Sequence, residues 1–383
     1  MTDYKNEALD LHGKFKGKIE IKIKDNVDSK EKLSTYYTPG VAAISEAIAA
    51  NPEDLKKYTW ASNNLAIISN GTSVLGLGDI GPKASLPVME GKAMLFKQFA
   101  GIDAVPIVIN SKNPDDFVRT VKDLAPGFSA INLEDIAAPE CFDIEKKLIE
   151  ELDIPIMHDD QHGTAIIVLA GLINAMKVVG KELNFSKIVL VGSGAAGTAI
   201  AKLIHEFAIN AELILVDSKG ILSSTRSDMN ESKNVLLRIS NPKNISGSLE
   251  DALTSADVFI GVSRGNLLNA DLIRKMNPRA IIFAMANPTP EISPDEAKRG
   301  GAEVIATGRS DYPNQINNAL VFPGLFKGAI DSNTKKITTE HKINAAKAIA
   351  NLIENPTKDE IIPSIFDDRL VPALVSVFHS NVL

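Results

Sequence analysis

The stretch that decides the fold is Lys187-Ile188-Val189-Leu190-Val191, followed directly by Gly192-Ser193-Gly194-Ala195-Ala196-Gly197. The first run is apolar and rich in branched residues, which predicts a buried strand, and the pattern from the last glycine to residue 208 predicts a helix. A second apolar run at 213–216 ends at Asp217, twenty residues after Gly197. A strand, a glycine-rich turn, a helix and a distant acid together form the dinucleotide-binding fingerprint.

Each glycine of this fingerprint has a physical role. Gly192 permits the tight turn, Gly194 lets a pyrophosphate approach the backbone, and Gly197 allows the helix to pack closely on the strand. Free amide groups at the helix N-terminus then bind the phosphates. We therefore expect the cofactor to lie along Gly192, Ser193, Gly194, Ala195, Ala196 and Gly197.

The acid after the second strand bears on the choice of cofactor. Asp217 would accept hydrogen bonds from the adenosine ribose hydroxyls, which favours NAD⁺. The next residues, Ser218 and Lys219, can tolerate or attract a phosphate, so NADP⁺ stays an alternative. On the glycines alone, FAD is a further candidate.

Short apolar runs alternate with helical patterns along the chain, which predicts an α/β fold with mostly parallel strands. Further strands are expected at 66–69, 104–109, 258–262, 280–284 and 304–306. Helices are expected at 41–50 and 345–352, and an apolar helix from an N-cap at Thr164 to a C-cap at Gly180. We expect an N-terminal α/β catalytic domain over residues 1–157 and a Rossmann-type doubly wound dinucleotide-binding domain with C-terminal helices over residues 158–383.

Charge and composition argue against several classes of protein. The chain has 383 residues and a net charge of -7, which argues against a nucleic-acid-binding surface. The start of the chain is polar, so no secretory signal is expected, and the longest apolar stretch, Ala165 to Met176, is too short to span a bilayer. Cys141 is the only cysteine, which excludes an internal disulfide and is typical of the cytoplasm.

Two adjacent carboxylate pairs, Glu134-Asp135 and Asp159-Asp160, each end an apolar run. Paired acids at the ends of strands lose solvation energy unless a positive charge answers them. A hard cation such as Mg²⁺ or Mn²⁺ takes carboxylate oxygens and keeps positions open for substrate. The alternative is that the acids are solvated and cap nearby helices. His158 and His162 flank the second pair and leave a zinc-like site conceivable, but two histidines without a thiolate favour the hard cation.

Two further residues are candidates for proton transfer. Tyr37 lies on a turn just before the helix expected at 41–50, and Lys92 opens an apolar helix that continues over residues 93–96. We expect burial and a nearby cation to lower the pKa of such a lysine, so that it can act as a base near neutral pH. Taken singly, both would be surface residues in most proteins.

Seven blocks of the chain carry a resemblance to a known family. They are Tyr37-Thr38-Pro39-Gly40, Leu86-Pro87-Val88-Met89-Glu90-Gly91-Lys92, Ile131-Asn132-Leu133-Glu134-Asp135, His158-Asp159-Asp160-Gln161-His162-Gly163-Thr164, Ala306-Thr307-Gly308-Arg309-Ser310-Asp311-Tyr312-Pro313-Asn314-Gln315, Asn317-Asn318 and Phe322-Pro323-Gly324. In this order the set resembles the malic enzymes, in particular their short bacterial and archaeal form. The resemblance implies oxidative decarboxylation of malate to pyruvate and CO₂, with NAD⁺ or NADP⁺ and a divalent cation.

The resemblance also implies a role for individual residues. The metal ligands would be Glu134, Asp135 and Asp160. Tyr37 would be the general acid and Lys92 the general base, with Asp159 holding the charge and orientation of the lysine.

Two asparagines, Asn287 and Asn318, match the family's contacts to the substrate carboxylates. One stretch departs from the pattern. Some larger members place an arginine shortly before a Leu-Gly-Leu-Gly-Asp block to bind a substrate carboxylate, whereas this chain reads Ser73-Val74-Leu75-Gly76-Leu77-Gly78-Asp79. The source of the cationic contact is therefore open. A homodimer is implied by the resemblance alone.

Three other functions remain as alternatives. An amino-acid dehydrogenase also pairs a lysine-bearing domain with a dinucleotide domain, but it needs no metal. A malolactic enzyme would share the motifs and release lactate without net NADH. A catalytically silent NAD-binding protein would not need Tyr37, Lys92 and the three acids, and this chain retains them all.

Overall fold

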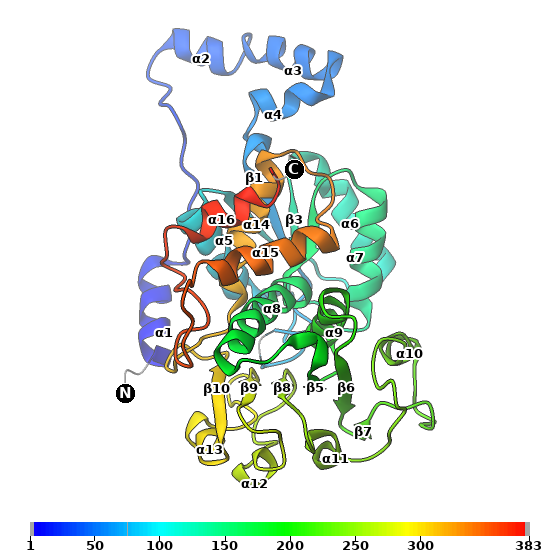
Figure 1. The fold of residues 1–383 in the computed structure, drawn as a ribbon. Coiled ribbons are helices and arrows are strands. Elements are labelled where there is room, and N and C mark those ends of the chain that lie inside the picture. The colour runs from blue at the N-terminus through cyan, green and yellow to red at the C-terminus, as the bar shows by residue number, and fades with distance from the viewer. Residues whose placement is uncertain (1–3, 75, 380–383) are drawn as a thin grey trace.

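The first of two β-sheets lies in the N-terminal half of the computed structural model, which describes residues 4–74 and 76–379 (Figure 1). Its strands are β1 (Asn64–Ser69), β2 (Asp103–Val108), β3 (Ile131–Leu133) and β4 (Ile156–His158), in the order β2-β1-β3-β4. All neighbours pair in parallel. The carboxyl ends of β3 and β4 therefore meet at one edge of the sheet, and both acid pairs follow them there.

The second sheet follows the predicted dinucleotide-binding pattern. Its strands are β5 (Lys187–Val191), β6 (Glu212–Asp217), β7 (Gly220–Ile221), β8 (Val258–Gly261), β9 (Ala280–Ala284) and β10 (Ala302–Thr307), in the order β10-β9-β8-β5-β6-β7. All pairs are parallel except the short edge pair β6-β7. The strand order reverses between β5 and β8, and this switch point is where such sheets bind their cofactor. The expected α/β class and parallel strands are confirmed.

Alternate residues of each strand enter different cores, because side chains along a strand point to opposite faces. Leu65 and Ile67 of β1 face one core, whereas Ala66 and Ile68 face another under α6 (Pro114–Leu124) and α7 (Glu140–Glu151). The second sheet has its own outer layer: α11 (Leu249–Leu253), α12 (Ala270–Ile273) and α13 (Pro294–Arg299).

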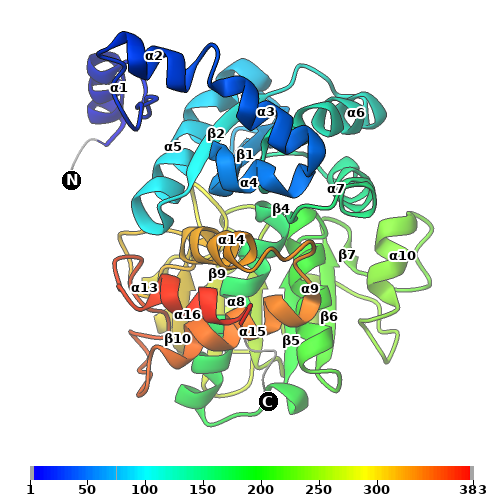
Figure 2. The same ribbon diagram turned by 90° about the horizontal axis from the view of Figure 1, so that it is seen from above.

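The inner faces of both sheets share one core. It includes side chains of α5 (Pro82–Ala100), α8 (Asp159–Val179), α9 (Ala195–Phe207), α14 (Phe322–Asp331) and α15 (Thr339–Asn351). In Figure 2, α14 lies between the two sheet regions. The ring centroids of Phe96 and Phe322 are 4.7 Å apart, so helices from opposite ends of the chain pack together. The two acid pairs lie where the halves meet.

The apolar helix α8 begins earlier than the sequence indicates. Its N-cap is His158 rather than Thr164, and Asp159 and Asp160 form its first turn. The prediction of Thr164 was wrong because β4 runs directly into the helix and leaves no loop. The predicted end is right, since Gly180 is left-handed with φ 61°. The helix is long and apolar enough to cross a membrane, but 72% of that stretch is buried inside the protein, as in a core helix.

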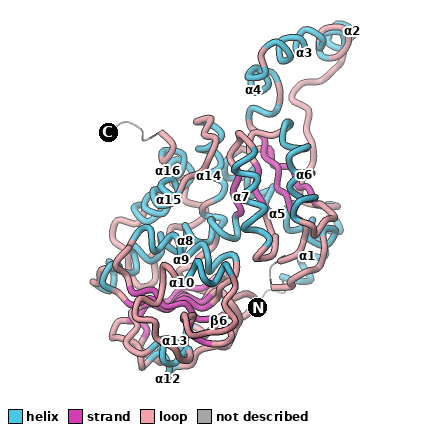
Figure 3. Tube along the Cα trace, turned by 90° about the vertical axis from the view of Figure 1, so that its right-hand side faces the viewer, coloured by secondary structure: helices cyan, strands magenta, loops and turns pink. Residues whose placement is uncertain are grey.

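Three short helices leave the body as an arm. They are α2 (Lys30–Tyr36), α3 (Val41–Ala50) and α4 (Leu55–Tyr58), and they project beyond the first sheet in Figures 1 and 3. The arm rejoins the body at the amino end of β1, which is opposite to the acid pairs. The other helices are α1 (Tyr4–Phe15), α10 (Glu231–Leu237) and α16 (Leu370–Ser376).

Candidate active site

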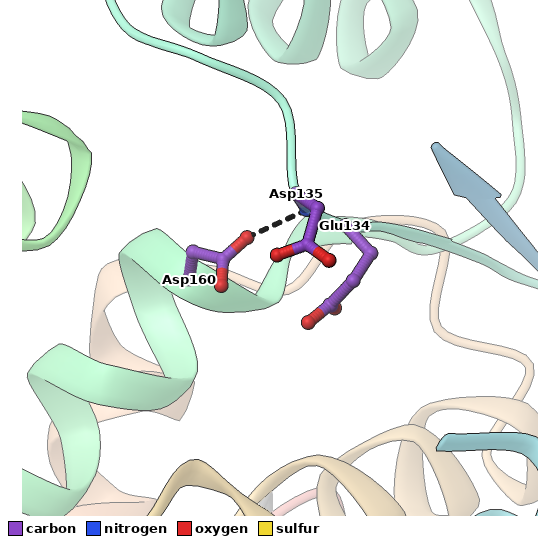
Figure 4. A group of neighbouring side chains, drawn as sticks. All are labelled: Glu134, Asp135 and Asp160. Carbon is purple, nitrogen blue, oxygen red and sulfur yellow. Dashed lines mark hydrogen bonds between the residues drawn. The ribbon is translucent and has the colours of Figure 1, made fainter. Parts of the chain in front are cut away.

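Three of the four acids form a cluster at the carboxyl edge of the first sheet. Glu134 and Asp135 directly follow β3, and Asp160 comes from the first turn of α8 (Figure 4). One carboxylate oxygen from each lies within 4.8 Å of the others. Asp160 Oδ2 also accepts a hydrogen bond of 2.8 Å from the backbone N–H of Asp135. The structure thus brings together Glu134, Asp135 and Asp160.

The backbone at Asp135 is held in an unusual conformation. Its φ of 53° is left-handed, a region that aspartate tolerates better than most residues. Its carbonyl accepts a 3.0 Å hydrogen bond from Ser73 N–H, while its own N–H donates to Asp160. Strain of this kind persists only where the surroundings enforce it, and it is typical of functional sites.

From the sequence we expected Lys92 to open a helix, but it lies in the middle of α5. Pro87 lies inside α5, so the helix begins before this proline and continues through it. The Nζ atom of Lys92 contacts the Asp159 carboxylate and lies 2.7 Å from Glu134 Oε1. It also lies 4.3 Å from the centre of the Phe322 ring. Lys92 is therefore buried between two carboxylates and under an aromatic ring.

The pKa of Lys92 does not follow the expected direction. Burial alone would lower it, but the charges of Asp159, Glu134 and Asp160 outweigh burial and raise the pKa above its usual value. The expectation of a lowered pKa is wrong for the protein without a cation. Burial in turn raises the pKa values of Glu134 and Asp159, against the opposing effect of Lys92.

Asp159 contacts both Lys92 and Asn318. Its Oδ2 atom also accepts a 2.5 Å hydrogen bond from Asn318 Nδ2, which begins the short helix after β10. A Cβ atom at position 163 would lie 1.9 Å from Asp159 Oδ1, so only glycine fits at Gly163. Asp159, Lys92 and Asn318 therefore form one connected group beside the three acids.

Sequence reasoning missed the residue that supports this arrangement from behind. Glu145 of α7 is buried, and its carboxylate accepts hydrogen bonds from His158 N–H at 2.7 Å and Gln161 Nε2 at 3.1 Å. His162 Nε2 lies 3.0 Å from the same carboxylate. Glu145 thus holds the first turn of α8, which carries Asp159 and Asp160. The sequence pattern that could have identified Glu145 is a single acid on the otherwise apolar face of a helix.

The predicted cofactor loop has the expected form. Gly192 has φ 121°, and a Cβ atom at Gly197 would lie 1.9 Å from Gly192 O, so both positions require glycine. A Cβ at Gly194 would meet nothing within 4 Å, which leaves room for a pyrophosphate beside the backbone. Ala195 begins α9. These residues fit a dinucleotide at the helix N-terminus.

Asp217 ends β6, as predicted, but other groups already surround its carboxylate. Arg226 donates to both oxygens, at 2.9 and 2.8 Å. Lys233 Nζ lies 2.8 Å from Oδ2, and Lys219 N–H donates to Oδ1 at 2.8 Å.

Asn287 lies in the loop after β9, and Tyr37 lies on the arm. A Cβ atom at Gly76 would lie 2.7 Å from Asn287 O, so the loop after β9 meets the stretch at 73–79, of which Leu75 lies outside the described residues. Tyr37 lies between α2 and α3 on the arm, and its side chain is 67% exposed. The structure does not bring Tyr37 to the acids of its own chain.

The donor set of the cluster suits a hard divalent cation. Carboxylate oxygens are the ligands that Mg²⁺ and Mn²⁺ take, and these three converge from two elements. His158 Nε2 lies 3.7 Å from Asp160 Oδ2, which places the imidazole behind the ligands.

The chain is similar to known proteins over nearly its whole length. Residues 16–149 match the N-terminal domain of malic enzymes, and residues 161–377 match the malic enzyme NAD-binding domain. The chain is 48% identical to a bifunctional malic/malolactic enzyme of Bacillus subtilis, over 97% of this chain and 91% of that protein. It is 42% identical to an NADP-dependent malic enzyme of Halomonas elongata, over 98% of this chain and 93% of that protein.

A solved structure is similar throughout. The NAD-dependent malic enzyme of Thermotoga maritima superposes with a TM-score of 0.95 at 46% identity, over 97% of this chain and 99% of that one. The chain therefore belongs to the malic enzyme family.

Proposed function

We propose that Lys92, Asp159 and the cluster of Glu134, Asp135 and Asp160 form the catalytic centre of an NAD(P)-dependent malic enzyme. The chain oxidises malate, decarboxylates the product to pyruvate and CO₂, and reduces NAD(P)⁺. The observation that carries this proposal is the burial of Lys92 between Asp159 and Glu134, directly beside the other two acids.

The side chains divide the proton transfers. Lys92 Nζ takes the proton of the C2 hydroxyl while hydride leaves C2 for the nicotinamide, and this gives oxaloacetate. Asp159 holds the lysine in place by direct contact. Asn318 acts through Asp159, because its side chain donates a hydrogen bond to the Asp159 carboxylate. After CO₂ has left, Tyr37 protonates C3 of enolpyruvate. Asn287 and Asn318 contact the substrate carboxylates in this scheme.

Glu134, Asp135 and Asp160 would hold the divalent cation, Mg²⁺ or Mn²⁺. When bound, the cation supplies positive charge next to the C2 oxygen, which polarises the carbonyl and opposes the protonation of Lys92. Because Lys92 and the cation share Glu134, the protonation of the lysine depends on the charge beside it.

A second copy of the chain completes the site in this proposal. The arm that carries Tyr37 joins the amino end of β1, whereas the acids follow the carboxyl ends of β3 and β4. β1 has six residues, and at about 3.3 Å per residue the two edges lie roughly 20 Å apart. Tyr37 therefore reaches an acid cluster in a partner chain and not in its own.

The surface of the arm supports a homodimer. None of the residues of α2, α3 or α4 is buried. Large apolar side chains are exposed along it and next to it: Leu33 50%, Tyr36 54%, Val41 38%, Tyr58 41% and Trp60 48%. Exposed apolar patches of this kind mark protein interfaces. A two-fold dimer would bury both arms, each against the other chain.

Two further proposals concern the domain boundary and the cellular location. The catalytic domain comprises residues 1–157 and the dinucleotide domain residues 158–383, a division that falls within β4. The protein works in the cytoplasm, where the buried thiol of Cys141 stays reduced.

The proposed function is tested by incubating the purified chain with malate and either NAD⁺ or NADP⁺, with Mn²⁺ or with excess EDTA. We expect pyruvate and reduced dinucleotide in equal amounts with Mn²⁺, and neither with EDTA. Full activity in EDTA would contradict the metal site, and the absence of malate oxidation under every condition would contradict the proposed function. Lactate without net NADH would indicate a malolactic enzyme.

A further inference from the structure

Asp217 is part of an ion cluster and is not a free acid that could bind a ribose. The cluster comprises Asp217, Asp228, Arg226, Lys219 and Lys233. A carboxylate offers about four acceptor positions on its two oxygens. Oδ1 of Asp217 accepts from Lys219 N–H and Arg226, and Oδ2 accepts from Arg226 and lies 2.8 Å from Lys233 Nζ. The Asp217 side chain is only 9% exposed. No acceptor position is left for the ribose hydroxyls, which would have to donate to it.

The hydrogen-bond donors of Arg226 are also fully used. Its guanidinium also donates to both oxygens of Asp228, at 2.9 and 2.7 Å, and to Gly220 O at 3.1 Å. The five N–H groups of an arginine are thus all used. Arg226 therefore holds and neutralises the two acids and has no donor left for a ligand.

The two lysines of the cluster keep free donors. Lys219 Nζ is 3.2 Å from Asp228 Oδ2 with a side chain 65% exposed, and Lys233 Nζ contacts Asp217 and is 20% exposed. Each ammonium has three N–H groups, so both can donate further. Three cations (Arg226, Lys219, Lys233) against two carboxylates (Asp217, Asp228) leave the cluster with one net positive charge.

The cluster lies next to the dinucleotide loop. Gly192 N–H donates to Val216 O at 3.0 Å, and Asp217 is the next residue. In this fold the end of the second strand faces the adenosine ribose. We propose that Lys219 and Lys233, with Asp217 and Asp228 neutralised by Arg226, receive the 2′-phosphate of NADP⁺, so that the chain prefers NADP⁺ over NAD⁺. This inference rests on the proposed function and specifies its cofactor.

The test uses ligand fragments, so that it does not depend on malate turnover. Adenosine 2′,5′-bisphosphate and adenosine 5′-monophosphate differ only in the 2′-phosphate. Calorimetry on the full chain should show the bisphosphate binding at least about tenfold more tightly, as expected for a phosphate held by two ammonium groups. Equal binding, tighter binding of the monophosphate or no binding of either would overturn the proposal.

Three variants identify the groups responsible. Lys219→Gln and Lys233→Gln should each remove much of the preference for the bisphosphate. Arg226→Gln should abolish the preference, because Asp217 then repels a phosphate and is free to accept from a ribose. Arg369→Gln is the matched control, since Arg369 forms a similar bidentate pair with Asp367 elsewhere. A preference kept in both lysine variants would overturn the proposal, even if Arg226→Gln failed to fold.

Discussion

At the residue scale, Lys92 is central to the proposed mechanism. Its ammonium is balanced by Asp159 and Glu134, and Glu134 also belongs to the predicted cation site. In the proposed mechanism, Glu134 would therefore serve two positive groups, Lys92 and the cation. Such sharing would link metal binding to the charge of the proposed base, which the spacing of the residues in the sequence does not reveal.

Replacing the lysine should remove the base. Lys92→Ala should lower kcat for malate oxidation by about a thousandfold, within the range for general bases. Lys97→Ala is the matched control, because Lys97 lies on the same helix but is 61% exposed and pairs with Asp103. Steady-state assays of both variants test the prediction, and turnover in Lys92→Ala close to that of the control would contradict it.

The acid cluster should bind Mn²⁺ in the absence of substrate. We expect one ion per chain by calorimetry, and Asp160→Asn should weaken its binding by about tenfold or more, because it removes one of three charged ligands. Asp153→Asn changes an acid that is 84% exposed and should have no effect. Equal Mn²⁺ affinity in Asp160→Asn would place the ion elsewhere.

At the element scale, the first turn of α8 is the part of the site that depends most on its neighbours. It carries Asp159 and Asp160, and Glu145 of α7 holds it from behind. Burial alone would raise the pKa of Glu145, but His162, Lys342 and His158 outweigh burial and lower the pKa to about 2. The ionised carboxylate is therefore the form that the fold stabilises.

This gives a stability prediction with a definite sign. Glu145→Gln should lower the free energy of unfolding by about 2 kcal/mol at neutral pH, the magnitude of hydrogen bonds to a charged group. Because the folded pKa is depressed, the advantage of the wild type is complete above the ordinary pKa and is lost as pH falls toward about 2.

Denaturant unfolding at several pH values measures this difference. Glu151→Gln is the control on the same helix, since Glu151 is 43% exposed and pairs with Lys122. An advantage of the wild type that did not shrink in acid would show that Glu145 acts through packing and not through its charge.

The elements themselves were largely predictable from the sequence. The strand at 187–191 matches β5, and the runs at 280–284 and 213–216 lie in β9 and β6, because buried parallel strands are continuous apolar runs. Where α8 begins was not predictable, because tertiary contacts from Glu145 and β4 decide it. Lys92 was misplaced for a related reason: a proline normally interrupts a helix, but α5 continues through Pro87.

The partners of Asp217 in the ion cluster could not be predicted from the sequence either, because they lie beyond the fingerprint in the chain. The fingerprint places an acid at the end of the second strand correctly. Its partners Arg226 and Lys233 come from the segment after β7, and nothing in the fingerprint predicts that they turn back to it.

At the scale of the whole molecule, two sheets share one helical core and the arm stands outside it. The body positions the base, the acids and the dinucleotide loop within one chain. Tyr37, the proposed proton donor, lies between α2 and α3. These helices belong to the arm, which projects beyond the first sheet (Figures 1 and 3). In the proposed mechanism the catalytic unit is therefore the dimer and not the single chain.

Mixing two inactive variants tests this account most directly. Tyr37→Phe and Lys92→Ala are each purified, then unfolded and refolded together, and malate oxidation and pyruvate release are measured. If Tyr37 acts across the dimer, every mixed dimer has one site with both Tyr37 and Lys92 intact, and random pairing restores about a quarter of wild-type activity. If Tyr37 acts within its own chain, no site is complete and the mixture stays as inactive as its components, which would contradict the account.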